Sequence, residues 1–184
     1  MDEIVRQAMA KWPHVPACYG WLALDARGNW YMRDERVQAA GAFDSGVPQA
    51  KGSLLRHDKL LEFIGRNYGC DEAGCWYFQN GPQRVFVELE ATPWIWRLQP
   101  DGRVHSHTGQ PAQVLGAEVD EAGRLYLRTD LGFGLVHSQD MALAADWIEQ
   151  GRWVPEPVRA AQLPQRHRYV RSPQRDRAGS PSRP

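Results

Sequence analysis

Residues 75 to 90 read CWYFQNGPQRVFVELE, and this stretch carries the clearest local signal in the chain. Asn80 and Gly81 at its centre are the pair preferred for a two-residue β-hairpin turn. The residues on both sides are mainly aromatic and β-branched, which favours strands. The stretch therefore predicts an antiparallel hairpin.

The second half of this hairpin alternates in polarity. Because successive side chains of a strand point to opposite faces, Val85, Val87 and Leu89 share one face, and Glu88 and Glu90 share the other. Two carboxylates on one face could serve in acid–base chemistry, but a half-buried sheet with one solvated face explains them more simply. We expect that solvated face.

The segment DEAGCWYF at residues 71–78 has two near-copies, DARGNWYM at 25–32 and DEAGRLYL at 120–127. Each lies between two expected strands. The Asp side chain can accept a hydrogen bond from the backbone just ahead, and Gly can adopt the dihedrals of a tight turn. The copies lack the alternating oxygen ligands and distal Glu of a calcium loop. They are best interpreted as three hairpin turns, with a rim of turns lining a ligand site as the alternative.

Three segments have helical patterns, at about residues 2–10, 57–68 and 139–149. The remaining patterns between residues 18 and 136 indicate strands joined by turns. The predicted fold class is therefore α+β, mainly antiparallel β-hairpins with about three helices.

Residues 1–154 are expected to form one globular domain, with a division into two lobes near 91–100, where Pro93 interrupts the strand pattern. Residues 155–184 form a Pro- and Arg-rich tail. The formal net charge of the whole chain is zero, but the tail contains seven Arg and one Asp from Arg159 onward, so the body is acidic. We expect the tail to be largely disordered after residue 171.

The overall composition fits a soluble globular protein that contains eight Trp. No apolar run approaches the roughly 20 residues of a membrane helix, so no membrane partner is expected. Three Cys, an odd number, do not form a secreted disulfide framework. These features favour a cytoplasmic location.

Trp94, Trp96 and Arg97 form the most suggestive candidate for ligand binding. The two Trp are two residues apart on a strand and so share a face, where they either stack on a ligand or bury beneath another element. Burial is the commoner outcome for such a pair.

His105 and His107 likewise alternate on an expected strand and are a candidate pair of metal ligands, although no third ligand stands at a diagnostic spacing. Polar residues on a solvated strand face are the alternative. The chain contains no nucleophile-elbow, P-loop or dinucleotide-binding motif. No catalytic residue and no cofactor are therefore predicted.

Three segments carry a resemblance to a known family: CYGWLALDARGNWYMRD, FIGRNYGCDEAGCWYFQNGPQRVFVELEATPWIWRL and GRLYLRTDLGFGLVHSQDMALAADWIEQGRW. They lie between about residues 12 and 153, and the chain resembles an uncharacterised proteobacterial family of unknown function. The order of its motifs is more distantly similar to a second bacterial family of unknown function with a mixed α/β fold. The resemblances imply a bacterial origin and a mixed architecture, but no catalytic residue.

The sequence thus favours a non-enzymatic binding or interaction module, which could self-associate or bind another protein. One alternative is a small-ligand enzyme or metal-binding protein that uses His105 and His107. Another is nucleic-acid association through the basic residues Arg159 to Arg183. The tail could equally dock on the acidic body of its own chain or of a neighbour.

Overall fold

A computed structural model describes residues 1–179 of the chain, which divide into two compact units. The first unit comprises residues 1–25, 29–90 and the C-terminal residues from 169 onward. The second comprises residues 91–168 together with the tip of one turn, 26–28. The chain therefore passes from the first unit to the second after Glu90 and returns at Tyr169.

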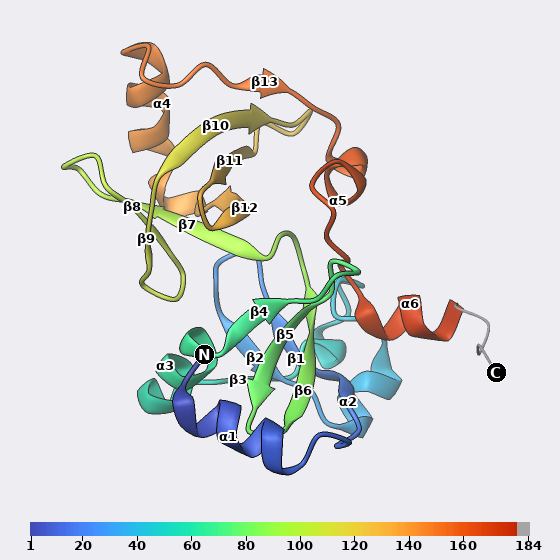
Figure 1. Ribbon diagram of the computed structural model, residues 1–184. Coiled ribbons are helices and arrows are strands. Elements are labelled where there is room, and N and C mark those ends of the chain that lie inside the picture. Colours follow the sequence, from blue (N-terminus) through green and yellow to red (C-terminus); the bar gives the residue numbers. More distant parts are fainter. Residues whose placement is uncertain (180–184) are drawn as a thin grey trace. The chain divides into compact units, whose positions relative to one another are not determined.

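The first unit is built on a six-stranded sheet (Figure 1). Its strands, in spatial order, are β3 (Ser53–Leu54), β2 (Trp30–Met32), β1 (Cys18–Leu24), β6 (Gln83–Leu89), β5 (Trp76–Asn80) and β4 (Tyr68–Cys70). Neighbours are antiparallel except β1 and β6, which are parallel. The helices of this unit are α1 (Glu3–Lys11), α2 (Glu35–Ala40), α3 (Asp58–Arg66) and α6 (Pro173–Gly179), with a 3₁₀ turn at Pro48–Ala50. Figure 1 shows α3 and α6 on opposite sides of this sheet.

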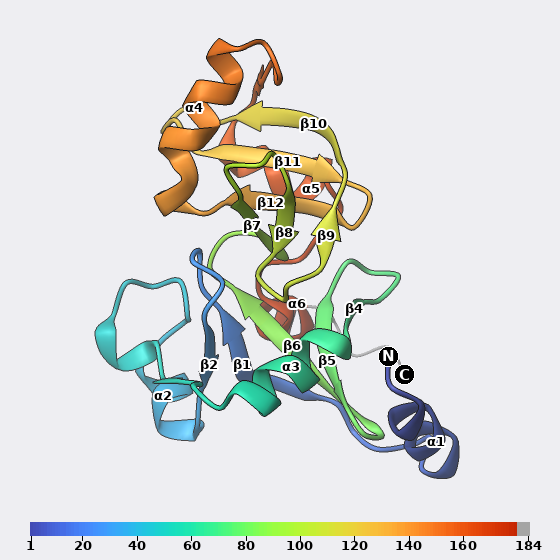
Figure 2. The ribbon, with the colours of Figure 1, turned by 90° about the vertical axis from the view of Figure 1, so that its left-hand side faces the viewer.

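The second unit contains a seven-stranded sheet (Figure 2). In spatial order its strands are β13 (Glu156–Pro157), β10 (Val114–Val119), β11 (Leu125–Thr129), β12 (Gly132–Val136), β7 (Trp94–Leu98), β8 (Val104–Ser106) and β9 (Pro111–Ala112). The β10–β13 and β12–β7 pairs are parallel and the others antiparallel. The helices are α4 (Met141–Glu149) and α5 (Leu163–Arg166), with 3₁₀ turns at Ser138–Asp140 and Ala160–Gln162. An irregular register between Val114 and Gly116 accompanies the bend of β10.

The fold is a mixture of helices and mostly antiparallel sheets, as the sequence predicts. The expected number of helices is wrong, because residues 1–179 contain six α-helices instead of about three. The additional helices are α2, α5 and α6, of six, four and seven residues. Such short helices span too few turns to produce a periodic apolar stripe.

The predicted hairpin is confirmed, with Phe78 opposite Val85, but its turn is one residue further along than expected. Asn80 pairs with Gln83, so the two turn residues are Gly81 and Pro82 and not Asn80 and Gly81. Gly81 has a φ of 57°, which the turn requires.

The three copies of the Asp-x-x-Gly motif form the same hairpin turn. The backbone N–H groups of Asp25, Asp71 and Asp120 donate to the carbonyl oxygen four residues ahead, at 3.0, 3.0 and 3.1 Å. In return, the N–H of that residue donates to the Asp carboxylate at 2.9, 2.8 and 2.9 Å. The motif is therefore explained by local turn chemistry. Two further turns, starting at Gln99 and Ser106, repeat the backbone bond without an Asp.

The C-terminal segment differs from the expected disordered tail. The N–H of Val170 donates to the carbonyl of Gly74 at 2.9 Å, and the carbonyl of Arg171 accepts from Leu89 at 2.8 Å. Residues 173–179 then form α6 on the first unit. The expectation of disorder after residue 171 is thus wrong up to Gly179, because acidic groups of the first unit bind the segment; residues 180–184 lie outside the described part of the chain.

Candidate functional site

Helix α3 forms one wall of an apolar pocket in the first unit. The helix begins where His57 Nδ1 accepts the N–H of Leu60 at 3.3 Å. Its apolar residues recur at helical spacing, so one stripe faces the sheet. Phe63 packs edge-on against Phe78 of β5, with ring centroids 5.4 Å apart. This contact fixes α3 against the strands beside the pocket.

The pocket, called here the α3 pocket, has a volume of about 280 Å³. It is lined by residues of α3, of strands β1, β2, β5 and β6 and of one loop: Cys18, Trp21, Leu22, Met32, Leu55, Leu60, Ile64, Phe78, Asn80 and Val85. None of these ten side chains is acidic or basic. The pocket therefore offers an apolar surface with a single amide group.

Two large apolar side chains of the lining remain open to solvent. Trp21 is 41% exposed and Met32 is 49% exposed, although each comes from a strand of the sheet. Apolar side chains gathered around a concavity are typical of ligand-binding sites. Solvent can therefore reach the α3 pocket past these two residues.

Cys18 is the thiol of this pocket, and the other two cysteines lie outside it. All three are free. Burial, reinforced by Asp71, raises the pKa of Cys75 to about 12, whereas Cys70 is exposed to solvent. Because the thiolate is the reactive form, Cys75 reacts slowly at neutral pH.

The ligand-binding surface expected at Trp94 and Trp96 is wrong. The two residues are only 5% and 0% exposed, and their rings stack with centroids 5.9 Å apart. Their indole N–H groups donate to the carbonyls of Leu131 and Leu127 at 3.0 and 3.2 Å. Both aromatic groups therefore belong to the core of the protein.

Arg97 takes part in an internal ion pair. Its Nε and Nη2 donate to the two carboxylate oxygens of Asp140 at 2.7 and 3.1 Å, and the N–H of Leu98 adds a third bond at 3.0 Å. Burial opposes ionisation of Asp140, but these hydrogen bonds lower its pKa below the ordinary value. Arg97 thus joins β7 to the segment before α4.

His105 and His107 occupy different local structures. His105 lies in β8 opposite Arg97, whereas His107 lies in the turn that follows, so the expected strand ends one residue before it. His107 Nδ1 accepts the N–H of Ile95 at 3.3 Å, and its ring centroid is 5.7 Å from that of Trp94. Within residues 1–179, no group of three or more His, Cys, Asp or Glu is arranged to hold a metal ion. Metal binding by the two His stays a prediction.

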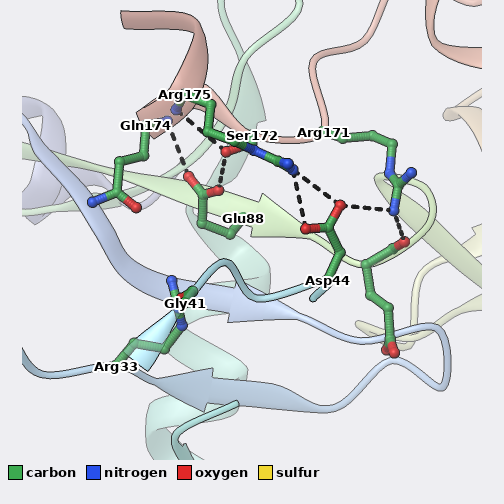
Figure 3. Close-up of polar contacts among 9 residues, drawn as sticks. Arg33, Gly41, Asp44, Glu88, Arg171, Ser172, Gln174 and Arg175 are labelled. Carbon is green, nitrogen blue, oxygen red and sulfur yellow. Dashed lines mark hydrogen bonds and ion pairs between the residues drawn. The ribbon is translucent and has the colours of Figure 1, made fainter. Parts of the chain in front are cut away.

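Glu88 lies in a polar cluster on the opposite face of the first sheet from Val85. Ser172 Oγ donates to one of its carboxylate oxygens at 2.5 Å, and the N–H of Gln174 donates to the other at 3.0 Å (Figure 3). Burial raises the pKa of Glu88, although Ser172 and Gln174 act in the opposite direction. The solvated face expected here is wrong, because the C-terminal segment covers Glu88 and leaves it 3% exposed.

Arg33 and Asp44 extend this cluster (Figure 3). The buried guanidinium of Arg33 donates to three carbonyl oxygens, those of Ala50, Gly20 and Gly41. Asp44 forms ion pairs with two arginines of the C-terminal segment, Arg171 at 3.3 Å and Arg175 at 2.9 Å. The cluster uses its polar groups internally and holds the segment in place.

The second unit contains a comparable buried carboxylate, Glu118. His167 Nε2 lies 2.9 Å from it, and the Nε atoms of Arg166 and Arg128 lie at 3.3 and 3.5 Å. The His167 ring stacks on Phe133 with centroids 3.6 Å apart. No sequence pattern indicates this cluster, since the partners of Glu118 are separated from it by ten to 49 residues and match no motif.

A family model matches residues 1–174, almost the whole described chain. It is DUF2944, and its description reads "Protein of unknown function (DUF2946)". The chain belongs to this family. The membership agrees with the predicted resemblance to a family of unknown function. Comparison with curated proteins gives no match.

Among solved structures, the DUF2944 chain is similar to two crystal structures of DUF1285 family proteins. The protein from Silicibacter pomeroyi DSS-3 is 11% identical, with 68% of each chain covered and a TM-score of 0.45. The protein from Shewanella baltica OS155 is 15% identical, with 68% of this chain and 91% of that chain covered and a TM-score of 0.45. Within residues 1–179 of the DUF2944 chain, every helix is too short or too polar to cross a membrane.

Proposed function

We propose that this chain is a non-enzymatic binding module whose α3 pocket holds a small apolar molecule. The observation that carries the proposal is the pocket itself, about 280 Å³ of open space bounded by nine apolar or thiol side chains and one amide. Binding there removes apolar surface of both ligand and protein from water, which is favourable. The sequence-based expectation of a bacterial cytoplasmic protein is retained as part of the proposal.

The test uses the full chain and 1-octanol as the probe. A ligand that binds only the folded state raises the melting temperature, so octanol should raise Tm in a concentration-dependent manner. Octanol should also slow the reaction of Cys18 with N-ethylmaleimide, because Cys18 lines the pocket. A Cys18→Ser variant identifies which part of the labelling signal comes from this thiol.

The matched pair of variants is Leu60→Trp and Leu115→Trp. Leu60 lines the pocket, whereas Leu115 lies in the second unit and is 64% exposed. The larger ring at residue 60 should fill the pocket and abolish both effects, and the same change at residue 115 should leave them intact. The proposal is wrong if neither octanol, its ionised analogues octanoate and octylammonium, nor the uncharged probe naphthalene shifts Tm or protects Cys18 in the unmodified protein.

A further inference from the structure

The proposed function leaves the class of ligand open. The volume and the lining residues of the pocket restrict that class. We infer that the α3 pocket selects an uncharged molecule of about nine to eleven heavy atoms, with an apolar body and a single hydrogen-bonding group directed at Asn80. This inference rests on the proposed function and adds size, charge and orientation to it.

The volume sets the size of the ligand. An apolar cavity of about 150 Å³ accommodates benzene, which has six heavy atoms, and a water molecule occupies about 30 Å³ of liquid. At about 25 to 30 Å³ for each heavy atom, the 280 Å³ of the α3 pocket accommodates roughly nine to eleven heavy atoms. An eight-carbon chain with one oxygen falls in this range.

The lining sets the charge. None of the ten lining side chains is a carboxylate or a cation. A carboxylate or ammonium group would lose all its hydration inside the pocket and part of it beside the exposed Asn80, and it would meet no opposite charge among the lining residues, which is unfavourable. A neutral hydroxyl or carbonyl group loses far less. The pocket therefore discriminates against ionised amphiphiles of the same length.

Asn80 sets the orientation of the ligand. It is an exposed residue at the end of β5, and its side chain makes no hydrogen bond with the residues that the structure describes. A ligand group paired with it therefore lies where the pocket meets solvent. Its amide offers both a donor and an acceptor, so it can pair with a hydroxyl or carbonyl oxygen. The apolar end of the ligand then lies against side chains such as Ile64 and Phe78.

The experiment compares three probes of equal chain length at neutral pH: 1-octanol, octanoate and octylammonium. Binding is measured by protection of Cys18 and by calorimetry. Octanol should bind at least tenfold more tightly than either ion. Octanoate or octylammonium binding as tightly as octanol would overturn this inference and leave the proposed function standing. Failure of all three probes, and of the uncharged probe naphthalene, would overturn both.

A charge introduced at residue 80 tests the role assigned to the amide. Asn80→Asp changes an exposed side chain at the end of β5 that makes no hydrogen bond with the described residues, so the hairpin should form. The variant should bind octanol at least fivefold more weakly and octylammonium more tightly than the unmodified protein does. Gln150→Glu, in the second unit, changes the net charge equally and should alter neither affinity. Equal octanol affinity in the Asn80→Asp variant would show that the hydrogen-bonding group does not lie at Asn80.

Discussion

The two buried glutamates of this protein, Glu88 in the first unit and Glu118 in the second, are held by different chemistry. Both lie on strands, are at most 3% exposed and take partners from the C-terminal part of the chain. Glu88 receives hydrogen bonds from a hydroxyl and a backbone N–H, which are uncharged. Glu118 instead faces the side chains of His167 and two arginines. Glu88 is thus hydrogen-bonded by neutral donors, with Arg33 and Arg175 acting on its charge without a direct ion pair, whereas Glu118 faces two arginines directly.

This difference indicates how the C-terminal part of the chain is used. Residues 166 and 167 contact the buried Glu118 of the second unit, and residues 169–175 close one face of the first. A segment that composition alone assigns to a disordered basic tail therefore contributes to the core of both units. Of its six arginines within the described residues, four contact acidic or aromatic groups of the chain: Arg166, Arg171, Arg175 and Arg177. Binding of the acidic body was one of the alternatives for this tail.

The largest effect should follow from ending the chain after Arg168. The truncation removes the buried ring of Tyr169 together with the donors to Glu88 and the two backbone bonds of Val170 and Arg171. Loss of one large buried aromatic side chain alone costs about 3 to 5 kcal/mol. We expect the unfolding free energy of the first unit to fall by at least that amount.

Hydrogen exchange measured amide by amide separates the two units in this truncated chain. Amides of β1 and β6 should exchange much faster, while those of β10 and β11, which belong to the second unit, serve as an internal control and should change little. Unchanged protection of β6 would contradict the role assigned to the segment.

A smaller effect should distinguish the two carboxylates directly. Glu118→Gln removes the charge that faces the two arginines, and breaking a buried pair costs about 3 to 5 kcal/mol. Since the arginine side chains are 42% and 47% exposed and stay hydrated, about 2 kcal/mol is expected for the second unit. Glu88→Gln removes a charge that burial already disfavours, so the loss of one hydrogen bond, about 1 kcal/mol, should dominate.

Urea unfolding of both variants, followed by hydrogen exchange to assign each loss to its unit, measures this difference. A Glu88→Gln variant that loses as much stability as Glu118→Gln would show that neutral donors and cations compensate a buried carboxylate equally well here.

The sequence predicts those parts of the fold that are determined locally. The hairpin turn at Gly81 has the glycine dihedral it needs, and the Asp-x-x-Gly turns also contain their own hydrogen-bond partners, so their structure follows from a few neighbouring residues. The exact turn pair of the first hairpin, Gly81 and Pro82, is set by the strand register. Whether one face of a strand is covered or solvated does not follow from neighbouring residues. Alternation correctly places Glu88 opposite in direction to Val87, but only the return of residues 169–179 decides that its face is covered.

The same limit explains the two errors at the candidate sites. Two Trp on one face of β7 are compatible with a buried or an exposed position. In the structure β7 pairs with β12 and both indoles are buried, so the pair belongs to the core. The α3 pocket is the space that remains when a helix and five other segments pack imperfectly, and no residue pattern encodes such a space. Leu60 and Ile64 are predictable as core-facing residues, but not as the wall of a pocket.

The pH dependence of stability should differ between the two units. Burial raises the pKa of Glu88 above its ordinary value of 4.5, so between that value and the higher one the folded state binds more protons than the unfolded state. The contribution of Glu88 to stability is therefore fully present at acid pH and is lost as the pH rises through its folded-state pKa.

The pKa of Asp140 in the second unit is lowered, so its contribution depends on pH in the opposite direction and is lost as the pH falls below 3.8. The stability of the unmodified first unit minus that of the Glu88→Gln variant should thus decrease from pH 4 to pH 7, as measured by urea unfolding across the series. The corresponding difference for Asp140→Asn in the second unit should increase as the pH rises from the acid range. Two differences that changed in the same direction would mean that burial does not disfavour the charge of Glu88.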